Sequence, residues 1–201
     1  MSCSTAGRLV LGPAYDFRRF VVGQTAGPPP TRRRAEADVR AARAVLTAAG
    51  CDLSRCQVSN LHTQTVALPA GRAYDLFLAW DAWPCSAFFA CPTTDAHGTA
   101  WLRYRFYRTL PIVVMRLKTA VRPYFIIYDL VWGIGAGGYH AFLFRPVSAA
   151  ETAASILTTF PPSRLFFEGL HDQMNLDVYR AVEAVAARTR QGDSVAWTSQ
   201  A

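Results

Sequence analysis

The chain has 201 residues, of which 51% are hydrophobic and 17% are charged, and its formal net charge is +7. This composition excludes a disordered chain, because it supplies enough apolar side chains to fill the core of about one domain, and we predict a single globular domain over 1–201. Lys118 is the only lysine, so twenty arginines supply nearly all of the basic charge. That bias is typical of a GC-rich genome, such as that of a high-GC bacterium or a GC-rich DNA virus.

The cysteine count and the N-terminal segment favour a reducing compartment. Five cysteines are an odd number, and no apolar leader precedes them. The location expected is therefore intracellular: cytoplasmic, or nuclear for a virus of a eukaryote. The longest apolar stretch, 123–144, has the length of a membrane span, but Asp129, His140 and a glycine cluster interrupt it. Two strands explain it better, so we predict no membrane span.

In the first third of the chain, the sequence predicts short strands, a loop and a helix. A helix over about 32–49 has Thr31 as its cap, an apolar stripe through Leu46, and Gly50 as its stop. The other elements expected are strands at 8–12 and 17–23, a proline-rich loop at 23–31, and flexible termini at about 1–6 and 191–201.

The middle of the chain is typical of an antiparallel sheet. The runs 63–68 and 72–80 flank a Pro-Ala-Gly turn and predict a β-hairpin, and 86–90 predicts a further strand. Four apolar runs separated by short breakers then predict a meander from 101 to 145. Pro111 weakens the break between the first two runs, which leaves one long bulged strand as an alternative there.

Two helices are predicted at the C-terminal end. Ser148 and Glu151 form a capping-box pattern before a helix over 148–159, and Asn175 begins a helix over 175–190. The fold class predicted is α+β. It consists of an antiparallel sheet of about five to eight strands, with the helices at about 32–49, 148–159 and 175–190 packed on one face.

Four glycines in six residues, Gly133 to Gly138, raise the question of a phosphate-binding loop. Such a loop needs a helix after the glycines, whereas the residues from Tyr139 alternate as a strand does. The glycines therefore predict a hairpin turn that needs positive φ angles.

Basic and aromatic side chains alternate along 101–108. If this segment is extended, Trp101, Arg103, Arg105 and Tyr107 share one face and the apolar residues share the other. Arg116 and Lys118 extend the basic character, and no acidic residue occurs between Asp95 and Asp129. The candidate binding residues are Trp101, Arg103, Arg105, Tyr107, Arg116 and Lys118.

This basic face fits two kinds of partner. An acidic protein surface is complementary to it, and single-stranded nucleic acid would place phosphates on the arginines and bases on the rings. No named nucleic-acid motif accompanies the face, so a protein partner is favoured. A solvated sheet face remains the alternative that needs no partner.

The cysteine and histidine spacings do not predict a metal site. Cys51 and Cys56 precede His62, and Cys85 and Cys91 precede His97, but neither pair has the two-residue spacing of a zinc knuckle. We expect no metal and no cofactor.

Asp129 and His140 are the one candidate catalytic pair. If the glycine loop closes a hairpin in which Trp132 faces Tyr139, Asp129 lies diagonally from His140 on one face. An Asp–His pair is an arrangement used for general-base catalysis, although a structural hydrogen bond is the other interpretation.

The function predicted from sequence is a non-enzymatic intracellular accessory or protein-interaction module. A nucleic-acid-binding protein that uses 101–108 is one alternative, and an enzyme that uses Asp129 and His140 is the other. The oligomeric state is left open by the sequence.

Overall fold

A computed structural model describes residues 36–79, 93–94, 100–106, 110–162 and 168–190, with the side chains of 93–94, 100–112, 168–174, 177 and 189–190 excepted. The elements in chain order are α2 (Glu36–Ala48), β1 (Val58–Val66), α3 (Ala70–Leu78), β2 (Thr93–Thr94), β3 (Ala100–Phe106), β4 (Leu110–Val121), β5 (Phe125–Gly133), β6 (Tyr139–Pro146), β7 (Thr152–Phe160) and α4 (Glu168–Arg190).

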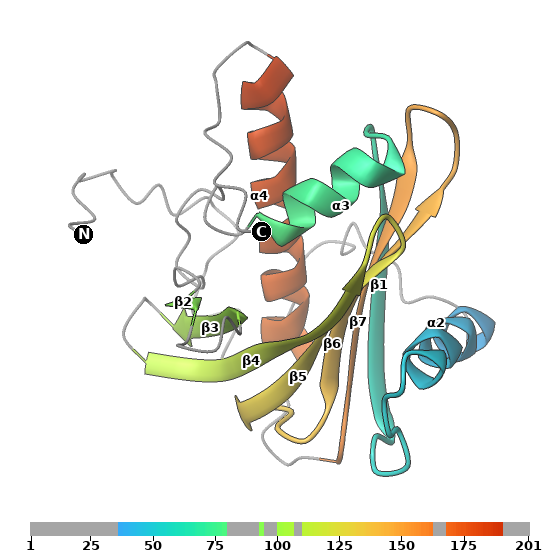
Figure 1. Cartoon of the computed structure of the whole chain (residues 1–201). Coiled ribbons are helices and arrows are strands. Elements are labelled where there is room, and N and C mark those ends of the chain that lie inside the picture. Colours follow the sequence, from blue (N-terminus) through green and yellow to red (C-terminus); the bar gives the residue numbers. More distant parts are fainter. Residues whose placement is uncertain (1–35, 80–92, 95–99, 107–109, 163–167, 191–201) are drawn as a thin grey trace.

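The described strands form one seven-stranded sheet in the order β1-β7-β6-β5-β4-β3-β2, and every neighbouring pair is antiparallel. Strands β2 to β7 follow one another as a meander, and β1 then pairs with β7 at the far edge (Figure 1). The predicted α+β class and the meander over 101–145 are confirmed. β3 and β4 are two paired strands, so the single bulged strand is excluded.

Helices cover both faces of the sheet, which corrects the prediction that they share one. Figure 1 shows α3 and α4 on one side of the curved sheet, here called the inner face, and α2 on the other, the outer face. On the inner face, Phe77 of α3 and Val182 of α4 pack in one buried cluster with Phe142 of β6. On the outer face, Ala42 and Leu46 of α2 pack on the sheet in a second cluster. Nearly every residue of the central strands is apolar, and successive side chains point to opposite faces, so both faces are apolar and each requires cover.

The predicted helices at the two ends of the described chain are confirmed. α2 spans Glu36–Ala48, and Gly50, with a φ of 79°, follows it as the predicted stop. α4 begins earlier than expected, at Glu168, and its valines Val178, Val182 and Val185 are all buried.

The helix predicted over 148–159 is wrong, because this segment forms β7. The Ser148 hydroxyl accepts a hydrogen bond from the Ala150 amide at 3.2 Å, and the Val147 amide donates to the Glu151 carbonyl at 2.9 Å, so the capping residues close a turn between strands. β7 is covered on both sides and buries every residue but Ser155. A strand buried on both faces lacks the polar alternation that identifies strands in sequence.

The hairpin predicted from 63–68 and 72–80 is also wrong in its second half. The first segment overlaps β1, but 70–78 is the helix α3, which comes directly after Pro69. Its apolar residues satisfy both periods: Tyr74, Leu76 and Leu78 alternate, whereas Ala73, Tyr74 and Phe77 share one helical face and are buried. Packing against the inner face decides between the two.

Several predictions fall outside the described residues: the strands at 8–12, 17–23 and 86–90, the loop at 23–31 and both termini. Within the part that the structure describes, no helix combines the length and the apolarity needed to cross a bilayer.

Candidate functional site

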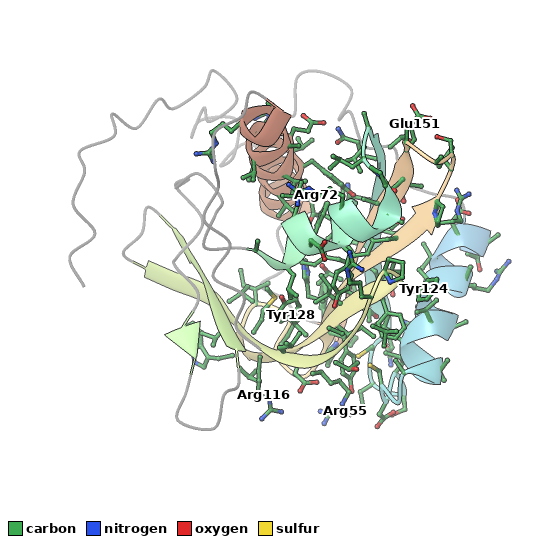
Figure 2. The ribbon with its side chains drawn as sticks, turned by 45° about the horizontal axis from the view of Figure 1, so that its top comes forward. Arg55, Arg72, Arg116, Tyr124, Tyr128 and Glu151 are labelled. Carbon is green, nitrogen blue, oxygen red and sulfur yellow. The ribbon has the colours of Figure 1, made fainter. Side chains whose placement is uncertain are left out.

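Four polar side chains form a continuous row across the inner face of the sheet. Asn60 of β1, Thr158 of β7, His140 of β6 and Tyr128 of β5 are successive cross-strand partners, so their side chains lie side by side. All four are buried, with exposed fractions between 3% and 9%. We call this set the polar row. Figure 2 shows Tyr128 on the side of the sheet that α3 covers.

His140 is held from two directions within this row. Its Nδ1 lies 2.9 Å from the Thr158 hydroxyl oxygen, and its ring meets the Phe142 ring edge-on at 5.0 Å between centroids. Phe142 in turn contacts the rings of Phe77 at 5.1 Å and Tyr128 at 6.2 Å. The imidazole is therefore fixed in orientation at the border between a polar strip and an aromatic cluster.

One further polar group connects α4 to this part of the sheet. The Tyr179 hydroxyl lies 3.2 Å from the His62 carbonyl oxygen and 3.0 Å from the Ala154 carbonyl oxygen. These carbonyls belong to β1 and β7, so the tyrosine holds α4 across the two strands. His62 itself is buried, two residues along β1 from Asn60 and on the same face.

The chemistry of the polar row is hydrogen bonding in a poorly solvated place. An asparagine amide and an imidazole each offer a donor and an acceptor, and the two hydroxyls can act as either. Removing such groups from water costs about 1–3 kcal/mol each unless they find partners. Four of them together in an aromatic interior are suited to orient the polar groups of a mostly apolar molecule.

The predicted Asp129–His140 pair does not exist. The structure pairs Asp129 with Tyr139 and Tyr128 with His140, where the sequence-based hypothesis places Trp132 opposite Tyr139. Because adjacent residues of a strand point to opposite faces, Asp129 lies on the outer face and His140 on the inner face. Tyr139 pairs with Asp129 and not with Trp132, so the hairpin loop is longer than the hypothesis assumed, and this shift of register separates the two residues.

The glycine loop itself is a hairpin connection, as predicted. Gly133, Gly135 and Gly137 have φ angles of 87°, 81° and 83°, and β6 begins directly afterwards at Tyr139. The Gly137 amide donates to the Leu130 carbonyl at 2.8 Å, which closes the turn. No helix comes after the glycines, so the loop lacks the helix N-terminus that a phosphate-binding loop requires.

Two of the predicted binding residues, Arg116 and Lys118, contact the same carboxylate, that of Asp129. Arg116 is exposed, and its Nη2 lies 2.9 Å from Oδ2 of Asp129, while Nζ of Lys118 lies 3.8 Å from Oδ1 of the same carboxylate. Figure 2 shows Arg116 directed away from the sheet. Lys118 also lies 5.8 Å from the centroid of the Tyr139 ring. Asp129 comes from the neighbouring strand, so the local shortage of carboxylates in the sequence does not leave these cations without an anion.

The remaining predicted binding residues are described only in part. Trp101, Arg103 and Arg105 lie in β3, where Trp101 is the cross-strand partner of Arg116, but their side chains are outside the described set. Tyr107 is outside the described residues altogether.

The cysteines of the described part are buried thiols. Cys51 and Cys56 are free, and burial raises the pKa of both, so both are protonated at neutral pH. No group of three metal-binding side chains occurs within the described ranges. Cys85, Cys91 and His97 lie outside those ranges, so the absence of zinc stays a prediction.

The polar row is only partly visible in the sequence. The pattern points to His140, but with the wrong partner, and it does not point to Asn60, Thr158 or Tyr128. One signal is available: His140, Phe142 and Phe144 alternate, which puts a histidine on the buried face of a strand.

Comparison with solved structures places this architecture among known folds. The di-domain ARO/CYC protein StfQ of the steffimycin biosynthetic pathway aligns with a TM-score of 0.50 and 20% identity over 65% of this chain and 45% of its own. The Zhui aromatase/cyclase from Streptomyces sp. R1128 aligns with a TM-score of 0.50 and 14% identity over 69% and 99%. XoxI from Bacillus cereus aligns with a TM-score of 0.50 and 9% identity over 64% and 93%.

These likenesses show a shared α+β fold and nothing finer. No protein-family model and no curated protein matches the amino-acid sequence.

Proposed function

We propose that the inner face binds a small, largely aromatic molecule that carries hydroxyl or carbonyl groups. The observation that carries this proposal is the polar row, in which Asn60, His140 and two hydroxyl side chains line up across four strands beneath the helices. These side chains offer both donors and acceptors to the hydroxyl and carbonyl groups of such a ligand.

The surroundings of the row support an aromatic ligand. Phe77 contacts the rings of Phe142 and Tyr179 edge to face, at 5.1 Å and 6.1 Å between ring centroids. Such an environment favours flat, apolar rings over sugars or nucleotides, because it offers rings and few charges. Two solved proteins of this fold are named as aromatase/cyclases, which agrees with the same ligand class.

The test is binding of 1,8-dihydroxyanthraquinone, a fused-ring probe with hydroxyl and carbonyl groups, followed by fluorescence. His140→Ala and Asn60→Ala should each weaken its binding about tenfold, since each removes one buried hydrogen-bonding group worth roughly 1.4 kcal/mol. Thr65→Ala, an exposed site on the outer face of β1, should leave binding unchanged.

Circular dichroism should confirm that each variant is folded, and His140→Gln replaces His140→Ala if the alanine variant is not. Unchanged affinity in a folded His140 variant, or no saturable binding to the unaltered chain, would refute the proposal.

We propose as a second candidate the accessory or protein-interaction role that the sequence predicts, acting inside the cell through the outer face. Trp132 and Val131 are 53% and 38% exposed, and the partner of Trp132 on β4 is Val114, two residues from Arg116. An exposed ring on the same face as Arg116, which shares the Asp129 carboxylate with Lys118, suits an acidic protein partner.

The nucleic-acid alternative for this surface has a direct test. If nucleic acid is the partner, a labelled oligothymidylate will bind the chain, and the binding will weaken steeply with salt. The double change Arg116→Ala and Lys118→Ala will then reduce this binding, measured as fluorescence anisotropy. Arg55→Ala, which removes one exposed arginine in the loop before β1, is the control for the single change Arg116→Ala. Absent or salt-independent binding would exclude nucleic acid and leave the protein partner.

A further inference from the structure

A groove of about 350 Å³ lies between α2 and the outer face of the sheet. Its floor is one row of cross-strand partners, Thr63, Ser155, Leu143 and Phe125, from β1, β7, β6 and β5. Figure 2 shows Tyr124, at the turn between β4 and β5, beside α2. The sheet separates this groove from the polar row, so the two sites are independent.

Small side chains on both walls explain the hollow. Leu46 of α2 covers the neighbouring row of the outer face, where Leu61 and Leu157 are buried. Towards its N-terminus α2 presents Ala41 and Ala42, and β7 presents Ala153 and Ser155, so helix and sheet do not fill the space between them. Val45, Phe125 and Leu143 remain only partly buried along it. No described side chain covers the apolar wall that these three residues form. The volume of the groove is in the range of binding sites for small molecules.

The polar groups of the groove differ between its floor and its rim. On the floor, the Thr63 and Ser155 hydroxyl oxygens lie 2.8 Å apart and satisfy each other. On the rim stand Arg145 from β6 and Asp38 from the first turns of α2, both exposed. Neither forms an ion pair within the described part of the chain, so the guanidinium is available to a ligand.

We infer that this groove binds an amphipathic monocarboxylate, with the carboxylate on Arg145 and the apolar body along Val45 and Leu143. A planar guanidinium matches a carboxylate with two parallel hydrogen bonds, and the net charge of +7 favours an anionic ligand over a cationic one. Asp38, which also lines the groove, limits the ligand to one negative group, because it repels a second one. The exposed Tyr124 ring stands at the mouth of the groove.

The test uses 4-phenylbutyrate with the full chain, followed by shifts of backbone amide resonances. Arg145→Gln should weaken binding at least tenfold, which is the expected loss of one charge-assisted, bidentate contact. Asp38→Asn should leave the affinity unchanged or raise it, because a like charge is removed. The amine 4-phenylbutylamine should bind at least tenfold more weakly than the acid.

A second pair of variants tests whether binding requires the open volume of the groove. Ala41→Leu fills the groove from the helix side at an exposed position and should abolish binding, whereas Ala48→Leu, exposed on α2 away from the groove, should not. Thermal melts confirm that both are folded, and leucine is tolerated in a helix. Unchanged binding in Arg145→Gln or Ala41→Leu, or tighter binding of the amine than of the acid, would overturn the inference.

Discussion

Replacing Phe142 with alanine is expected to lower the free energy of unfolding by about 3–5 kcal/mol. The side chain is fully buried at the centre of the inner face and contacts the rings of Phe77, Tyr128 and His140. No neighbour can close the cavity cheaply, because each of these rings is held by its own strand or helix. Urea denaturation followed by circular dichroism measures the loss.

Tyr124 supplies the matched control for this experiment. It is also an aromatic residue of the sheet region, but it is 59% exposed, so Tyr124→Ala should change the unfolding free energy by less than about 1 kcal/mol. Similar losses in the two variants would contradict the placement of Phe142 at the centre of the buried cluster on the inner face.

Replacing Gly138 with alanine is expected to destabilise the chain by about 3 kcal/mol. A Cβ at this position would lie 2.6 Å from the Cα of Phe160 and would also clash with the Thr159 carbonyl oxygen. Both atoms belong to the backbone of β7, which is hydrogen-bonded on its two sides and cannot move away alone. The added methyl group must therefore separate β6 from β7 at the end of the hairpin. Urea denaturation measures this loss as well.

Gly50→Ala is the control that distinguishes the cost of a steric clash from the cost of backbone strain. Its φ of 79° makes alanine unfavourable, but nothing lies within 4 Å of an added Cβ, so Gly50→Ala should cost only about 1–2 kcal/mol. A loss at Gly138 no larger than that at Gly50 would show that the hairpin opens without resistance from β7.

The antiparallel sheet was predictable from the sequence because its central strands alternate. The segments of β3 to β6 carry aromatic and branched residues at every second position, and short turn segments separate them. This pattern is typical of antiparallel strands joined by hairpins. The role of the glycine loop was predictable for the same reason, because the residues after Gly138 alternate and the loop must therefore lead into a strand. α2 and α4 were predictable from apolar stripes of helical period.

Two elements were assigned to the wrong class because local pattern and environment disagree. β7 is buried on both faces, so it lacks polar alternation, and a capping-box pattern at Ser148 and Glu151 comes just before it, as it would before a helix. α3 is short, and its apolar residues fit the periods of both a helix and a strand. In each case packing against the rest of the molecule decides the class, and the local pattern does not.

The candidate sites required the tertiary structure because they consist of rows that cross strands. The sequence by itself determined that His140 lies in a strand and shares one face of it with Phe142 and Phe144. Only strand pairing could decide that Asn60 and Thr158 stand beside it and that Asp129 does not. A shift of one residue in a register exchanges the two faces, and the register depends on the length of the glycine loop and on contacts with distant strands. The groove under α2 likewise exists only because α2 packs across strands that lie far apart in the sequence, β1 and β5 to β7.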